Sequence, residues 1–118
     1  MLNANKRCLY AVLAGLLALG ASPSALARPS MWWDHFEAAA PETSECVKQA
    51  ENILTAEKAG ELVADSDSVR AWSEKTIAVA ECIKFGGQLI VAVLISSDDP
   101  TIGNKLYNAL RTGLKKQP

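Results

Sequence analysis

The sequence is poor in the residues that most enzymes use for catalysis or metal binding. It has one histidine, His35, and three cysteines, Cys8, Cys46 and Cys82. A lone histidine next to Asp34 does not make a catalytic triad, and the cysteines with one distant histidine do not form a recognisable zinc ligand set. The sequence also lacks a phosphate-binding loop and a nucleophile elbow. We therefore predict a protein that is not an enzyme and has no metal site and no cofactor.

Positive charge is also scarce. The chain has 12 lysines and arginines against 13 aspartates and glutamates. Lys6 and Arg7 fall in the first 27 residues, which leaves 10 basic against 13 acidic residues in the rest, a net charge of −3. A mildly acidic chain without a basic stripe is not expected to neutralise the phosphates of a nucleic acid.

The first 27 residues have the pattern of an export signal. Lys6 and Arg7 precede an apolar run over residues 9–21, and Ala25, Leu26 and Ala27 follow with the small-x-small spacing of a signal peptidase site. We expect a signal peptide over 1–27 and a mature protein of 91 residues from Arg28, located in the periplasm or secreted. No later apolar run approaches the 18 residues of a membrane span, so no integral membrane anchor is expected.

Two cysteines, Cys46 and Cys82, remain after the predicted signal. An even pair in an oxidising compartment predicts a disulfide. The two cysteines are far apart in sequence and form no C-x-x-C motif, so a redox role is not expected.

Residues 28–40 form an aromatic N-terminal arm ahead of a single small domain over residues 41–118. Trp32, Trp33 and Phe36 fall within five residues, and their spacing is compatible with one side of a short helical turn. Two interpretations stay open. The rings pack over the domain and enlarge its core, or they form a docking element, since clustered tryptophans are common interface anchors.

The domain reads as helix, hairpin and helix, with residues 61–72 left open between two short strands and a loop entering a helix. Apolar spacing predicts a helix over 41–59 that ends at Gly60. Gly86 and Gly87 separate two β-branched runs, which is typical of a β-hairpin. Asp99 and Pro100 mark the start of a closing helix, whose apolar positions recur at helical spacing.

A two-residue hairpin loop fixes which residues lie opposite each other. It pairs Phe85 with Gln88, Ile83 with Ile90 and Cys82 with Val91. One face then carries small and branched residues on which a helix packs with Cys46 near Cys82. The other face is also apolar and is interrupted only by Glu81, which we interpret as a residue that protects a sheet edge or meets a lysine of a partner.

These elements predict an α+β fold: a small antiparallel sheet with a central hairpin, flanked by an N-terminal and a C-terminal helix and joined by one disulfide. The alternative is an all-α domain of four helices, with 68–85 and 88–96 helical.

Cys46, Trp72, Cys82 and the apolar run over residues 89–95 resemble a loosely defined group of small secreted proteins. That group has a cysteine in a first helix, a tryptophan opening the sheet, a second cysteine in the next strand and a closing helix. The resemblance implies an α-β-β-β-α fold and no particular chemistry, because the group has no assigned function.

We expect an exported, non-catalytic binding protein, an inhibitor or immunity-type protein that recognises a protein partner by surface complementarity. Its candidate contact residues are Trp32, Trp33 and Phe36, together with the apolar hairpin face. The alternative is a structural or assembly accessory of an envelope complex, or a homodimer joined through the sheet.

Overall fold

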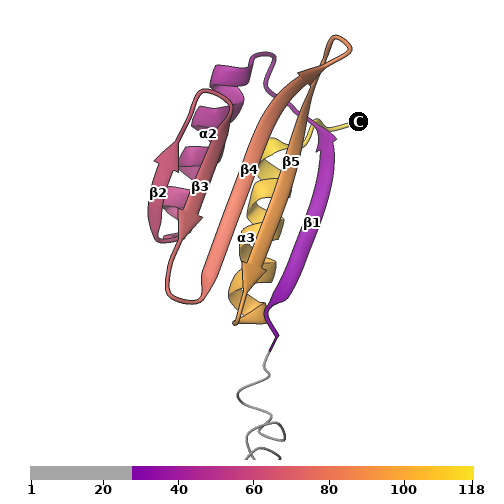
Figure 1. Cartoon of the computed structure of the whole chain (residues 1–118). Coiled ribbons are helices and arrows are strands. Elements are labelled where there is room, and N and C mark those ends of the chain that lie inside the picture. Colours follow the sequence, from indigo (N-terminus) through magenta and orange to yellow (C-terminus); the bar gives the residue numbers. More distant parts are fainter. Residues whose placement is uncertain (1–27) are drawn as a thin grey trace, which may run out of the picture.

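The computed structural model describes residues 28–118 and shows an α+β fold in which α2 and α3 cover one face of a five-stranded antiparallel sheet (Figure 1). The predicted signal peptide over 1–27 lies outside the described residues. The elements in chain order are β1 (Ser30–Glu37), α2 (Thr43–Ala56), β2 (Glu61–Ala64), β3 (Ser68–Trp72), β4 (Thr76–Phe85), β5 (Gln88–Ser97) and α3 (Pro100–Leu114). The strand order is β1-β5-β4-β3-β2. The predicted fold class is confirmed and the all-α alternative is wrong.

The central hairpin of β4 and β5 has the predicted register. Phe85 lies opposite Gln88, Ile83 opposite Ile90 and Cys82 opposite Val91. Gly86 and Gly87 both have positive φ, 59° and 84°, which is the conformation of a two-residue hairpin loop and one that other residues rarely adopt. Because side chains alternate between faces, this loop also determines which residues of both strands face the helices.

Strand β1 replaces the helical turn that the spacing of Trp32, Trp33 and Phe36 suggested. Residues 30–37 pair along their whole length with β5, from Ser30 opposite Ser97 to Glu37 opposite Ile90. The prediction of a turn is therefore wrong, and these residues form an edge strand of the sheet. For residues 61–72 the strand interpretation is confirmed, because β2 and β3 form a second hairpin.

Helix α2 ends about one turn earlier than predicted, through a different residue. The Lys58 N–H donates to the Thr55 carbonyl, and the Ala59 N–H donates to the Leu54 carbonyl. These bonds form a Schellman motif in which Lys58 is the left-handed residue, with φ of 54°. Gly60 does not end the helix, and its backbone instead passes close to that of Trp72.

Helix α3 begins as its sequence predicts. Asp99 is the N-cap, and its carboxylate accepts hydrogen bonds from the backbone N–H groups of Thr101 and Ile102. Pro100 follows in the first turn, where its missing N–H costs no intrahelical hydrogen bond. Within residues 28–118, neither α2 nor α3 is long and apolar enough to span a bilayer.

The core lies between the helices and the inner face of the sheet. Cys46 on α2 and Cys82 on β4 are both buried there and form the predicted disulfide. Around them the strands place small residues, Ala78 and Ala80 on β4 and Ala71 on β3, which leave room for a helix to approach closely. The largest side chains buried completely are Leu54, Ile95, Leu110 and Leu114.

Candidate functional site

The face of the sheet opposite the helices, called the open face below, is apolar and uncovered. Its exposed large side chains come from all five strands: Met31 and Trp33 on β1, Leu94 on β5, Ile77, Ile83 and Phe85 on β4, Trp72 on β3 and Val63 on β2. The view in Figure 1 looks onto this face, with both helices behind the sheet. An apolar patch of this extent on a small domain is typical of an interaction surface.

Three neighbouring strands form the apolar centre of the open face. Trp33 of β1 lies opposite Leu94 of β5, which in turn lies opposite Val79 of β4. The Trp33 side chain is 73% exposed although it stands on a strand paired along its whole length. Its position is therefore fixed by the backbone rather than by burial of the ring.

A hollow of about 280 Å³ lies beside this apolar centre and is called the Ala92 hollow below. Ala92 lies between His35 and Glu81 in the register of β1, β5 and β4, so a small side chain separates two larger polar ones. The hollow is lined by Trp33, Asp34, His35, Val79, Glu81, Ala92, Val93 and Leu94. Its lining is mostly apolar, with one imidazole and one exposed carboxylate.

The three aromatic candidates do not share one surface. Trp33 lies on the open face, whereas Phe36 is only 8% exposed and belongs to the core. Trp32 packs partly buried against α3, where its ring occupies the space that a side chain at Gly103 would need. Because a strand alternates its faces, Trp32 and Phe36 point inward together and cannot contact a partner on the open face.

Glu81 is not at a sheet edge. Its strand β4 is the central one, and Glu81 lies opposite Ala92 on one side and Ser68 on the other. The interpretation of Glu81 as protection for an edge is therefore wrong. The carboxylate stands instead in the middle of the open face, at the border of the Ala92 hollow.

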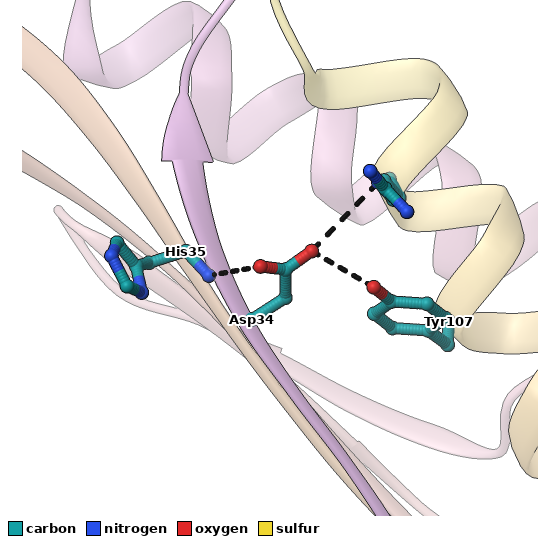
Figure 2. Close-up of polar contacts among 4 residues, drawn as sticks. Asp34, His35 and Tyr107 are labelled. Atoms are coloured by element: carbon teal, nitrogen blue, oxygen red, sulfur yellow. Dashed lines mark hydrogen bonds and ion pairs between the residues drawn. The ribbon is translucent and has the colours of Figure 1, made fainter.

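A polar cluster on the helix side of β1 ties this strand to α3. The Asp34 carboxylate accepts hydrogen bonds of 2.8 Å from the Tyr107 hydroxyl and of 2.8 Å from the His35 backbone N–H. The Arg111 guanidinium lies 3.8 Å from the same carboxylate. Figure 2 shows Asp34 pointing toward α3, while the His35 side chain points to the other side of the strand.

These contacts shift the pKa values of both main partners. The Tyr107 hydrogen bond lowers the pKa of Asp34, with smaller contributions in the same direction from the His35 N–H and the Arg111 charge, against an opposing effect of burial. The same hydrogen bond, followed by burial, raises the pKa of the Tyr107 hydroxyl. The cluster therefore holds an ionised carboxylate and a neutral phenol at neutral pH.

The cluster also limits pairing at the outer edge of β1. The His35 N–H is taken by Asp34, and the Glu37 carbonyl accepts a hydrogen bond from the Lys116 N–H. With these two edge groups satisfied, β1 offers little unpaired backbone to a strand of another chain. The open face, and not the sheet edge, is thus the surface available to a partner at β1.

We expect Tyr107→Phe to lower the free energy of unfolding at pH 7 by about 1 kcal/mol, because it removes one hydrogen bond to a partly exposed carboxylate. A lowered folded-state pKa of Asp34 contributes stability above the unfolded value of about 3.9, which is lost as the pH falls through the folded value. The variant should therefore lose less stability on acidification than the wild type. Urea unfolding at pH 7 and at pH 3 measures both effects, and equal acid sensitivity of the two proteins would contradict the role given to this bond.

Nothing in the described residues assembles a reactive centre around His35. The imidazole contacts the Trp33 ring edge-on, with centroids 5.8 Å apart, and it is exposed. Within residues 28–118, no group of three potential metal ligands is present, and every buried side-chain polar atom has a hydrogen-bond partner. The absence of catalytic activity stays a prediction.

Sequence reasoning missed Asp34, Tyr107 and Arg111 because their contacts link positions up to 77 apart, as numbered in the chain, and no local spacing connects them. The one available signal was the alternation of Trp32, Asp34 and Phe36, which predicts a strand only if a carboxylate is allowed on its inner face.

Comparison with known proteins finds no matching family model and no significant match among curated proteins or among solved structures.

Proposed function

We propose that this chain is an exported, non-catalytic binding protein that recognises a protein partner through the open face of its sheet, as an inhibitor or immunity-type protein does. The exposure of Trp33 at the centre of an apolar surface is the observation that carries this proposal. Tryptophan is enriched among the residues that dominate binding energy, and such residues lie near the centre of an interface.

The rigidity of the surface supports the same function. The residues around Trp33 stand on strands whose register is fixed on both sides, and Phe85 extends the apolar surface toward the hairpin end. A surface that is already ordered loses little conformational entropy on binding, so its apolar area contributes more to affinity. The export signal predicted over 1–27 and the buried disulfide support action in the periplasm or outside the cell.

Trp33→Ala is the test of this function. We expect the affinity for the partner to fall by about thirtyfold, the effect of removing a central aromatic anchor. The free energy of unfolding should change by less than about 1 kcal/mol, because the ring is mostly exposed. The partner is first isolated on the immobilised protein from an envelope extract, and its affinity for each variant is then measured with purified components by calorimetry.

Ile102→Ala is the matched control. Ile102 is also an exposed large apolar residue, but it lies on α3, on the far side of the sheet from the open face. It should leave the affinity unchanged. A partner that binds Trp33→Ala as tightly as the wild type would contradict the proposal. So would a stable homodimer in sedimentation that Trp33→Ala dissociates, because the open face would then be occupied by a second copy.

A further inference from the structure

The Ala92 hollow combines features that select one kind of side chain from the partner. Trp33, Leu94 and Val79 supply apolar walls, and the small Ala92 side chain leaves space between His35 and Glu81. A group that fills this space needs an apolar stem to lie along the walls and a polar end that reaches the Glu81 carboxylate. Long basic side chains have this construction, with methylene groups behind a charged head.

Glu81 has no cation of its own in the described part of the chain. The nearby basic residues are engaged elsewhere: Arg70 pairs with Asp65 at 3.2 Å and Lys84 with Glu42 at 3.0 Å. None of the ion pairs within residues 28–118 includes Glu81. A carboxylate surrounded by apolar side chains and left unpaired attracts a positive charge, and it does so more strongly once a partner excludes water from the surface.

The aromatic side of the hollow favours arginine over lysine and over a free metal ion. A guanidinium is planar, pairs with a carboxylate through two hydrogen bonds and stacks on an aromatic ring. Trp33 provides that ring, and its edge-on contact with His35, at an interplanar angle of 85°, limits its orientation. A metal ion would need several oxygen ligands, whereas no group of three potential ligands is found in the described residues.

We infer that the Ala92 hollow receives an arginine side chain of the protein partner, with its guanidinium paired to Glu81 and stacked on Trp33. This inference rests on the proposed function and specifies the chemistry that the partner presents to the open face. Glu81 is then the residue that gives the surface its specificity, because an apolar side chain in the hollow would leave this carboxylate buried and unpaired.

The direct test uses N-acetyl-arginine methylamide as a probe, and its citrulline counterpart, which has the same shape without the charge, as the neutral control. Titration of the ¹⁵N-labelled protein should shift the amide signal of Ala92 and the indole signal of Trp33, with an affinity in the millimolar range expected of so small a ligand. Citrulline should bind at least tenfold more weakly. Glu81→Gln should abolish the preference, while Glu74→Gln, which makes the same change at an exposed turn residue, should keep it.

Equal shifts with the two probes, no shift at Trp33 and Ala92, or an unchanged preference in Glu81→Gln would each overturn the inference. The same variants separate this failure from failure of the proposed function. If Trp33→Ala weakens binding of the partner and Glu81→Gln does not, the open face binds the partner but the hollow receives an uncharged group. If Trp33→Ala has no effect on the partner, the proposed function itself fails.

Discussion

Reduction of the Cys46–Cys82 disulfide is expected to lower the free energy of unfolding by about 4 kcal/mol, because the bond closes a loop of 36 residues and restricts the unfolded chain. A small domain is typically stable by about 5–15 kcal/mol, so this loss removes a large part of the total. The midpoint of thermal unfolding should fall by about 20 °C in a domain of this size. Urea and thermal unfolding with and without dithiothreitol measure the effect.

The double variant Cys46→Ala/Cys82→Ala separates the covalent link from the packing of the sulfur atoms. Both cysteines are buried, so alanine at each position removes apolar contacts as well as the cross-link. The variant should therefore be less stable than the reduced wild type and insensitive to dithiothreitol. A wild type whose unfolding midpoint does not change on complete reduction would show that the link adds little to stability.

The sequence predicts those elements whose determinants are close together in the chain. Gly86 and Gly87 fix a two-residue loop, and the alternation of side chains then places every residue of β4 and β5 on its face. Asp99 and Pro100 likewise determine where α3 begins, through hydrogen bonds that span two or three residues. In both cases the physical cause lies within the segment that it shapes.

The elements that sequence analysis assigned wrongly depend on distant partners. The inward position of Asp34 interrupts the alternation of β1, and only Tyr107, 73 residues away, makes that position favourable. Glu81 looked like an edge residue because nothing local shows that β1 and β3 extend the sheet on both sides of the hairpin. Hence the apolar character of the open face was predictable, whereas the hollow formed by residues of three strands was not.

Gly60→Ala is expected to be the most damaging single substitution of a small residue. A Cβ at this position would lie 2.1 Å from the Trp72 carbonyl oxygen, and the backbone has φ of 119°, which residues other than glycine rarely adopt. Since Glu61, the next residue, pairs with Trp72, relief of the clash requires the edge strand β2 to move away from β3. We expect a loss of about 3 kcal/mol or more in the free energy of unfolding, from strain and overpacking together.

Gly87→Ala separates the two contributions. Gly87 also has a positive φ, 84°, but no atom lies within 4 Å of the position that its Cβ would take. This variant suffers the backbone strain alone and should lose about 1 kcal/mol. Urea unfolding of both variants measures the difference, and hydrogen exchange should show faster opening of β2 in Gly60→Ala only. Equal losses in the two variants would mean that the close approach of Gly60 to Trp72 does not hold β2 in place, and that the conformation of the glycine explains the whole effect.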